Sequence, residues 1–270
     1  MRVGILADIH GNKPALDAVL VDAERQKIQT FWCLGDVVGY GPWPVHCWYM
    51  MRALKIPDDA WVAGNQELGL LQGAHANYCD GDARKVIIFH RQVCEKHPDI
   101  LDQIKRMRII AQPMPGVILA HGVPKPNDNF WTVTKYTETA ADPEQAVHGL
   151  SAVGIHPRVI AVGHTHRACF WHRMDDRNAD AKWNQKNAEA EVSLGDLDHQ
   201  VVYLNPGSVG QPRDGSREAG YCYIDWDKMT VCFRRVSYPL HLTRAKMIEL
   251  HYPEKLIHDW YSDSTYGGEK

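Results

Sequence analysis

Side chains able to bind a divalent metal recur along the sequence, each time close behind a short apolar segment. They are Asp8, His10, Asp36, Asn65, His121, His164 and His166. All of them offer oxygen or imidazole nitrogen and none is a thiolate, a donor set that suits Mn, Fe, Zn, Co or Ni ions. So many ligands exceed the need of one ion, but they fit two ions about 3.5–4 Å apart that share a carboxylate, with Asp36 as the natural bridge. Two such ions would create a positive pocket for an anionic phosphate group.

Short apolar runs predict the strands that must position these residues. Residues 3–7 form the first strand, and because residues two apart in a strand face the same side, Asp8 and His10 can converge where it ends. Ligands of open α/β sheets bind at the carboxyl ends of the strands, which is where the metal-binding residues fall. Further strands are expected at 30–34, 61–63, 108–111, 117–120, 158–162, 168–172, 201–204, 220–226 and 230–237, with helices at 13–27, 45–54, 80–97 and 143–153 and a loop at 123–137.

Length and composition favour one domain at 1–240, with a polar insertion at about 173–198 and a C-terminal extension at 241–270. The net charge of −3 and the pI near 6.6 supply no basic surface, so neither duplex nucleic acid nor a membrane is an expected partner. Seven cysteines without a C-x-x-C pair indicate reduced thiols. No apolar run reaches the roughly 18 residues of a membrane span, so a cytoplasmic protein is expected. The sequence leaves the oligomeric state open.

The spacing of these motifs resembles that of the calcineurin-like metallophosphoesterase superfamily. The shared motifs are Asp8-Ile9-His10-Gly11-Asn12, Gly35-Asp36-Val37-Val38-Gly39-Tyr40-Gly41-Pro42, Gly64-Asn65, His121-Gly122 and Gly163-His164-Thr165-His166. The resemblance spans residues 3 to about 236, and residues 205–215 are similar to a compact phosphodiesterase-like or diadenosine-tetraphosphatase-like subgroup. It implies an α/β (α+β) fold, a four-layer α/β/β/α sandwich of two mixed β-sheets flanked by helices. It also implies that Asp8, His10, Asp36 and His166 bind one metal, and that Asp36, Asn65, His121 and His164 bind the other.

One position departs from the family pattern. Where members commonly have Gly-Asn-His, with the His thought to face the leaving-group oxygen, this chain has Gln66. An amide can donate a hydrogen bond but has no titratable proton near neutral pH, so general-acid help for an alkoxide leaving group is in doubt. Glu67 and His75 are alternative acids by their proximity in the sequence.

Other residues have two readings each. Arg213 could bind a substrate phosphate with its planar guanidinium, or it could pair with Asp214 at the surface. Asn12 and Tyr40 either line the pocket or serve turn chemistry and packing. Phe130 and Trp131 could stack on a nucleobase, although loop aromatics more often pack against the protein.

The expected function is a binuclear phosphoesterase in which a metal-bridging hydroxide attacks a phosphodiester or phosphoanhydride of a small, nucleotide-type molecule. The expected catalytic residues are Asp36, Asn65, Gln66, His121 and Arg213. Mn and Fe are the favoured ions. A phosphomonoesterase or protein phosphatase is the alternative enzyme, and a non-catalytic metal-binding interaction module is the alternative of another class. A dinucleotide-binding Rossmann domain is excluded because no G-x-G-x-x-G follows the first strand.

Overall fold

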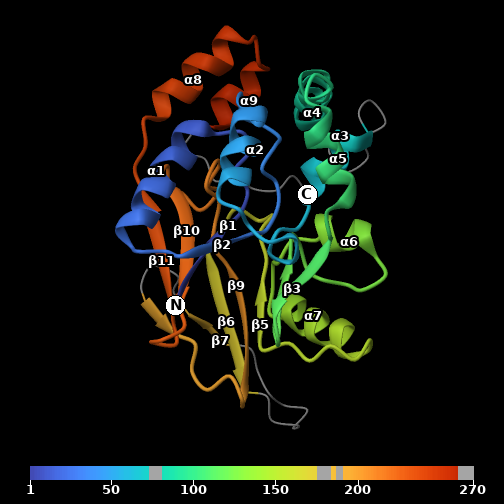
Figure 1. The fold of residues 1–270 in the computed structure, drawn as a ribbon, viewed down its shortest axis with the longest axis vertical. Helices are drawn as coiled ribbons and strands as arrows, with labels where there is room; N and C mark the ends of the chain where they lie inside the picture. Colours follow the sequence, from blue (N-terminus) through green and yellow to red (C-terminus); the bar gives the residue numbers. More distant parts are fainter. Residues whose placement is uncertain (73–80, 175–183, 187–190, 261–270) are drawn as a thin grey trace.

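Two β-sheets pack face to face, with helices on their outer sides (Figure 1). The computed structural model describes residues 1–72, 81–174, 184–186 and 191–260. One sheet has five strands in the order β2-β1-β10-β11-β8, and the other has six in the order β3-β4-β5-β9-β6-β7. The fold is therefore the four-layer α/β/β/α sandwich that the sequence motifs imply, and that prediction is confirmed.

The first sheet is mixed, because β1 runs parallel to β2 but antiparallel to β10. In register, Ile5 of β1 lies between Trp32 of β2 and Cys222 of β10. Its strands are β1 (Arg2–Leu6), β2 (Thr30–Cys33), β10 (Ala219–Asp225), β11 (Thr230–Val236) and β8 (Glu191–Ser193).

The second sheet is also mixed, with β4, β5 and β9 parallel in its centre and antiparallel partners on both sides. Its strands are β3 (Ile110–Met114), β4 (Val117–Ala120), β5 (Val159–Ala161), β9 (Gln200–Asn205), β6 (Cys169–Met174) and β7 (Asn184–Lys186). Of the predicted 173–198 insertion, the structure describes the last two residues of β6, the strand β7, which pairs antiparallel with β6, and residues 191–198, which include β8.

Alternating side chains divide each strand between two cores. Val3 and Ile5 of β1 face the space between the sheets, where they meet residues of β4 such as Val117, while Leu6 packs toward the helices on the other side. This period-2 pattern buries both faces, which explains why the strands read as continuous apolar runs. A third cluster fills the gap between the second sheet and α7, where Ile118 of β4 packs in the same cluster as helical residues.

The helices cover the outer faces and one end of the sandwich (Figure 1). α1 packs on β10 and β11, and α8 packs on α1. α8 and α9 contribute to a separate cluster with α4, which includes Met247 and Tyr252. The helices are α1 (Lys13–Arg25), α2 (Pro44–Ala53), α3 (Asn65–Gln72), α4 (Gly81–Cys94), α5 (Pro98–Arg106), α6 (Asn129–Thr134), α7 (Ala141–Ser151), α8 (Leu240–Glu249) and α9 (Glu254–Asp259), with a short 3₁₀ turn η1 (Asp58–Ala60).

Two local predictions are wrong. Residues 61–63 form no strand, because Trp61 and Val62 make only single bridges, to Cys33 and Arg108. The segment 123–137 is not all loop, because Asp128 caps α6 by accepting a hydrogen bond from the Trp131 N–H at 3.0 Å. The helices α3, α5, α8 and α9 were not expected.

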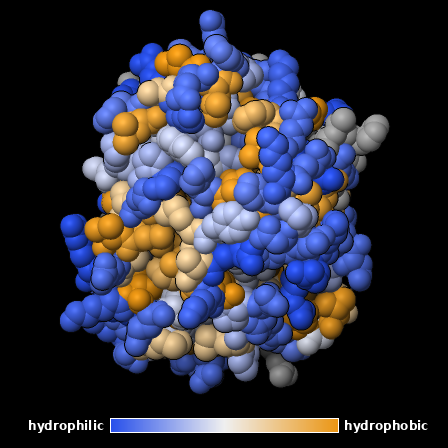
Figure 2. Space-filling model, turned by 45° about the horizontal axis from the view of Figure 1, so that its top comes forward, coloured by the Kyte–Doolittle hydropathy of each residue, from blue (hydrophilic) through white to orange (hydrophobic). Residues whose placement is uncertain are grey.

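The surface and the thiols agree with the composition. Figure 2 shows hydrophilic residues interspersed with smaller groups of hydrophobic ones. Within the described residues, no helix combines the length and apolarity needed to cross a bilayer. The six cysteines in the same part of the chain are free thiols, five of them buried.

Candidate metal centre

The ligand-bearing turns have unusual backbone conformations. Asp8, His10, Asp36, His164 and His166 all have positive φ, between 48° and 69°. Non-glycine residues rarely adopt this left-handed region, and such strain concentrates at functional sites where the surrounding structure fixes it. The five residues lie in the turns that follow β1, β2 and β5, so the conformation redirects the chain immediately after each strand.

Two glycines allow these turns to approach one another. A Cβ on Gly64 would lie 2.1 Å from Asp36 Oδ1, and a Cβ on Gly41 would lie 2.2 Å from the carbonyl oxygen of His10. Any larger residue would therefore displace a candidate ligand or its backbone. This is the physical reason for glycine in the Gly-Asn and Gly-Tyr-Gly motifs.

One cluster of donor atoms combines Asp8, His10 and His166, all buried. His10 Nε2 lies 2.9 Å from His166 Nε2, and Asp8 Oδ1 lies 3.4 Å from His166 Nε2 and 3.8 Å from His10 Nε2. Two ligands at right angles on an ion with bonds of about 2.1 Å would be about 3.0 Å apart. The spacing therefore suits atoms that share one ion.

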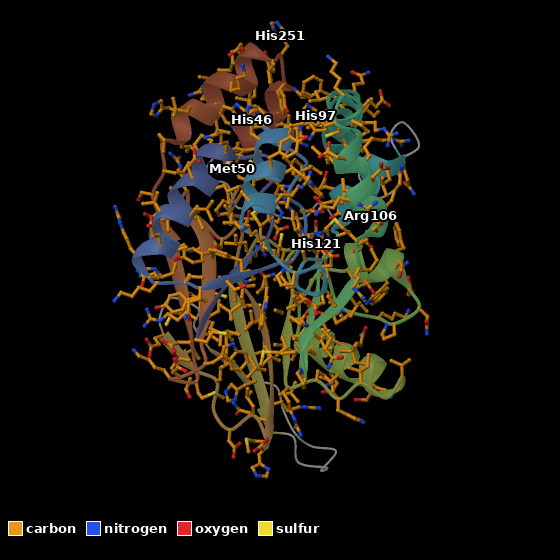
Figure 3. The ribbon with its side chains drawn as sticks, viewed as in Figure 1. His46, Met50, His97, Arg106, His121 and His251 are labelled. Carbon is orange, nitrogen blue, oxygen red and sulfur yellow. The ribbon has the colours of Figure 1, made fainter. Side chains whose placement is uncertain are left out.

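A second cluster combines Asp36, His121 and His164, and Asn65 adjoins it. His121 Nε2 lies 3.2 Å from Asp36 Oδ2, 3.1 Å from Asn65 Oδ1 and 3.1 Å from His164 Nδ1. In Figure 3, His121 lies at the level where the sheets meet the helices, whereas His97 and His251 lie among the helices above. All seven predicted metal ligands thus converge in two adjoining groups.

Asp36 lies between the two clusters. Its Oδ2 is 3.2 Å from His121 Nε2 and 3.9 Å from His10 Nε2, one histidine from each group. Its other oxygen, Oδ1, accepts a hydrogen bond from the Gln66 backbone N–H at 2.9 Å. The carboxylate is therefore fixed with one oxygen directed at both groups, the geometry that a bridging ligand requires.

Each of the four histidines is oriented by a backbone carbonyl. One ring nitrogen donates to the carbonyl of another segment, at 3.1 Å for His10–Val38, 2.7 Å for His121–Leu34, 2.9 Å for His164–Thr134 and 2.6 Å for His166–Gln211. A hydrogen bond of this kind fixes the tautomer and leaves the other nitrogen with a free lone pair. The free nitrogens of His10 and His166 face each other across the first cluster, and in the second cluster Nε2 of His121 lies 3.1 Å from Nδ1 of His164.

The opposed nitrogen lone pairs of His10 and His166 show whether a metal ion fits the first cluster. With both Nδ1–H groups engaged, His10 and His166 point two Nε2 lone pairs at each other across 2.9 Å. Nitrogen lone pairs at this distance repel unless a cation or a proton lies between them. Burial lowers the pKa of His10 to about 4 and holds that of His166 well below its ordinary value, so a proton is disfavoured near neutral pH. The donor set therefore fits a metal ion.

The second cluster has a different charge balance. Burial lowers the pKa of His164 to about 3. Burial also acts to lower the pKa of His121, but the Asp36 carboxylate outweighs it and raises that pKa to about 9. Burial raises the pKa of Asp8 to about 7, whereas the neighbouring His121 overcomes burial to lower the pKa of Asp36. Without a metal, positive charge thus concentrates on His121, beside the bridging carboxylate.

Glu67 organises the loop around Asp36. Its buried carboxylate accepts backbone N–H groups from Asp36 at 2.7 Å, Val37 at 2.8 Å, Val38 at 3.2 Å and Gly64 at 2.8 Å. Burial raises the pKa of Glu67 to about 7, although hydrogen bonds from these backbone donors act to lower it. Both oxygens are engaged by the backbone, so this carboxyl group is in no position to protonate a leaving group. His75, the other candidate acid, lies outside the described residues.

Gln66 and Arg213 occupy different surroundings. The Gln66 side chain is buried against Gly39, and its Oε1 has no hydrogen-bond partner within the described structure. Arg213 is half-buried, lies over the ring of Tyr40 at 5.5 Å and donates to Gln211 Oε1 at 3.0 Å. Its positive charge acts on the pKa of Asp8 and of three of the histidines, so the guanidinium lies close to the centre. Asp214 pairs with Arg235.

The remaining sequence candidates have mostly structural contacts. Asn12 caps α1 and donates to the Gly210 carbonyl at 2.8 Å, so it joins two loops. Tyr40 packs edge-on against His10, with ring centroids 4.7 Å apart. Lys125 Nζ lies 4.7 Å from the Trp131 ring, and Phe130 is 51% exposed.

The structure adds residues that sequence reasoning missed. Tyr136 stacks on His164, with ring centroids 4.3 Å apart and planes at 15°. His90 accepts from the Gly39 N–H at 3.2 Å and bonds Tyr252 Oη at 3.0 Å, which in turn donates to the Gly41 carbonyl at 3.2 Å. α4 and the C-terminal segment thereby support the loop that carries Tyr40. The position of His90 on the apolar face of its helix was the one signal available.

This sandwich, with clustered histidines and carboxylates in the turns after its strands, is that of a metallophosphoesterase. A family model described as "Calcineurin-like phosphoesterase superfamily domain" matches residues 1–229, and the chain belongs to that superfamily. It is a metal-dependent phosphoester hydrolase, so the family and enzyme class expected from the motifs are confirmed.

Similar proteins match nearly the whole chain. The uncharacterized protein MJ0912 of Methanocaldococcus jannaschii is 30% identical over 258 residues, covering 94% of this chain and 95% of that protein. A metallophosphoesterase from Sphaerobacter thermophilus has 28% identity and a TM-score of 0.77, covering 98% of this chain and all of its own. The hypothetical protein PH1004 from Pyrococcus horikoshii has 15% identity and a TM-score of 0.72, and the match covers 98% of this chain and 99% of that one. At this low identity, the match shows a similar fold only.

Proposed function

We propose that the chain binds two divalent ions and hydrolyses a phosphodiester or phosphoanhydride of a small, nucleotide-type molecule. In this proposal Asp8, His10, Asp36 and His166 bind one ion, and Asp36, Asn65, His121 and His164 bind the other. The observation that carries the proposal is the pair of opposed lone pairs of His10 and His166 beside a second, similar cluster. Oxygen and imidazole donors favour Mn or Fe, with Zn, Co and Ni as further candidates.

The residues of the chain would prepare this chemistry. Two bound ions supply a water of lowered pKa and positive charge for the phosphoryl group. The carbonyl partners of the four histidines keep each free nitrogen aimed inward, so little reorganisation is needed when ions bind. Asp36 keeps its position through Gln66 N–H and the Glu67 loop.

Arg213 would bind the substrate phosphate. Its guanidinium lies beside the two clusters and is partly exposed, while Asp214 is engaged by Arg235. A planar fork of N–H donors matches the oxygens of a phosphate. Replacing Arg213 with Gln should therefore raise KM by about tenfold, the value of one charge-assisted hydrogen bond.

Gln66 bears on the choice of substrate. It stands where family members commonly have a histidine, and Glu67 is committed to the backbone. A phosphoanhydride or activated diester leaves without a strong proton donor, whereas an alkyl monoester needs one. Phosphomonoester or phosphoprotein hydrolysis is therefore the second candidate.

The test is a reconstitution experiment. Protein stripped of metal should be inactive and should regain hydrolysis of bis(p-nitrophenyl) phosphate and of a dinucleoside polyphosphate on addition of Mn²⁺. The variant His166→Ala should not recover, while the control His241→Ala, at an exposed position on α8, should recover fully. Full activity of His166→Ala, or activity in the stripped protein, would contradict the proposal.

A further inference from the structure

Tyr136 combines contact with the metal centre and exposure to solvent. Its ring stacks on that of His164, with centroids 4.3 Å apart and planes at 15°. The residue is nevertheless 40% exposed, and within the described part of the chain no second ring or cation stacks on it. One face of the ring is therefore covered by a candidate metal ligand, while much of the rest of the side chain is open to a bound molecule.

The chain on both sides of Tyr136 is fixed. The preceding carbonyl, of Lys135, accepts a hydrogen bond from the Val123 N–H at 3.1 Å. The following side chain, of Thr137, is hydrogen-bonded through Oγ1 to Tyr203 Oη at 2.6 Å. The ring is thus held beside the metal centre before a ligand arrives, which reduces the entropy that binding costs.

Arg213 lies near the same ring. Burial acts to lower the pKa of the Arg213 guanidinium, but the nearby hydroxyls of Tyr40 and Tyr136 act to raise it, and it rises overall. Arg213 is also the residue proposed to bind the substrate phosphate. A molecule whose phosphate lies at Arg213 and the metal clusters therefore has Tyr136 within reach of the group that the phosphate carries.

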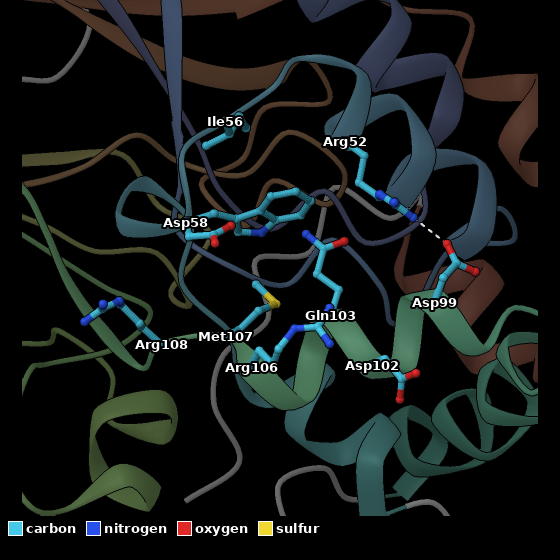
Figure 4. A pocket seen from close by; sticks show the side chains of 10 residues that line it. Arg52, Ile56, Asp58, Asp99, Asp102, Gln103, Arg106, Met107 and Arg108 are labelled. Carbon is cyan, nitrogen blue, oxygen red and sulfur yellow. Dashed lines mark hydrogen bonds and ion pairs between the residues drawn. The ribbon is translucent and has the colours of Figure 1, made fainter.

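Other aromatic rings are less suited to contact with a substrate. The ring of Trp131 already has Lys125 Nζ at 4.7 Å and Lys135 Nζ at 5.9 Å from its centroid. A cavity of about 580 Å³ between α2, η1 and α5 has three arginines and three aspartates in its lining, so their charges balance (Figure 4). Trp61, the aromatic residue of that lining, is only 4% exposed. The exposed ring beside a phosphate-binding group is therefore that of Tyr136.

We propose that the nucleobase of the substrate stacks on Tyr136, so that the enzyme prefers phosphate esters or anhydrides that carry a base. This inference rests on the proposed function and narrows its substrate class to nucleotides. A planar base would extend the stack that His164 and Tyr136 begin, while its phosphate lies at Arg213 and the metal clusters. Stacking on an aromatic side chain tolerates any base, so purines and pyrimidines would both bind.

The experiment compares the binding of AMP with that of ribose 5-phosphate, which has a hydroxyl group in place of the base. Each is titrated by calorimetry into the Mn²⁺-loaded protein. The wild type should bind AMP about 5- to 150-fold more tightly, the contribution of one stacked base. Tyr136→Leu should lose this preference, whereas Tyr136→Phe, which keeps a ring, should retain it. The matched control Phe130→Leu, at a position 51% exposed on α6, should also retain it.

Three results would overturn the proposal. They are equal affinities of the wild type for AMP and ribose 5-phosphate, an AMP preference that survives in Tyr136→Leu, and a loss in Tyr136→Leu that is the same for both ligands. The last result would mean that the ring only supports His164, and elemental analysis of Mn²⁺ in the variant would then show lost metal.

Turnover is measured separately, so the two proposals can fail independently. A protein that prefers AMP through Tyr136 but hydrolyses no phosphate ester or anhydride with Mn²⁺ bound would contradict the proposed function and leave the base-stacking role standing. Hydrolysis of such substrates without any preference for AMP over ribose 5-phosphate would contradict the base-stacking role alone.

Discussion

Replacing Glu67 with Gln should damage the metal centre without touching a metal ligand. The carboxylate accepts N–H groups from Asp36, Val37, Val38 and Gly64 with its two oxygens. The amide of Gln retains one oxygen, so two of the four donors would instead face its NH₂ group. Each buried N–H that loses its acceptor costs about 1–3 kcal/mol, so the variant should lose about 2–6 kcal/mol of unfolding free energy.

Urea unfolding of wild type and Glu67→Gln at pH 8, both without metal, measures this loss. The matched control is Glu95→Gln, an exposed carboxylate that pairs with Arg91 on α4 and should change stability by less than about 1 kcal/mol. Because the loop carries Asp36, Mn²⁺ affinity measured by titration should also fall at least about tenfold. Glu67→Gln with wild-type stability and Mn²⁺ affinity would refute the role assigned to the carboxylate.

Three further predictions concern the ligands, the leaving group and pH. Asp36→Asn and His164→Ala should each lower kcat by about two or more orders of magnitude with circular dichroism unchanged, and near-normal turnover at saturating Mn²⁺ would contradict their roles. The slope of log kcat/KM against leaving-group pKa should be steep in the wild type and flatter in Gln66→His, because a proton donor contributes about a hundred- to ten-thousandfold for poor leaving groups. A shallow wild-type slope would indicate another acid. Burial lowers the pKa of His90 to about 3 in the folded chain. In the unfolded chain the same imidazole binds a proton as the pH falls through about 6.5, whereas in the folded chain it stays neutral until about pH 3. Stability should therefore fall by about 3 kcal/mol from this residue between pH 6.5 and 4, and His90→Gln should remove that part of the pH dependence.

The residue pattern predicts the ligand set, whereas the layers of the fold are implied by the resemblance of the motifs to the superfamily. Val3 and Ile5 alternate with residues of the opposite face, and the metal-binding residues follow such strands closely, so their convergence at one edge could be predicted. The sequence of α5 also indicates a helix. Pro98 begins it, and Ile100, Leu101 and Ile104 form its buried stripe.

Other features depend on contacts between distant segments. The role of Glu67 requires backbone N–H groups from two separate loops, and nothing in its local sequence indicates them. Tyr136 meets His164 because the chain at the end of α6 lies against that histidine, whose Nε2 also bonds the Thr134 carbonyl at 2.9 Å. The short apolar run around Trp61 predicts a strand, yet Trp61 makes only a single bridge there. No local pattern indicates that its indole N–H has no hydrogen-bond partner among the residues that the structure describes.

The central claim is that Asp36 lies between two ions, and anomalous diffraction from crystals soaked in Mn²⁺ tests it most directly. We predict two peaks about 3.5–4 Å apart, one beside His10 and His166 and the other beside His121 and His164, with Asp36 Oδ2 contacting both. A single peak at saturating Mn²⁺, or two peaks with Asp36 turned away from either, would contradict the account.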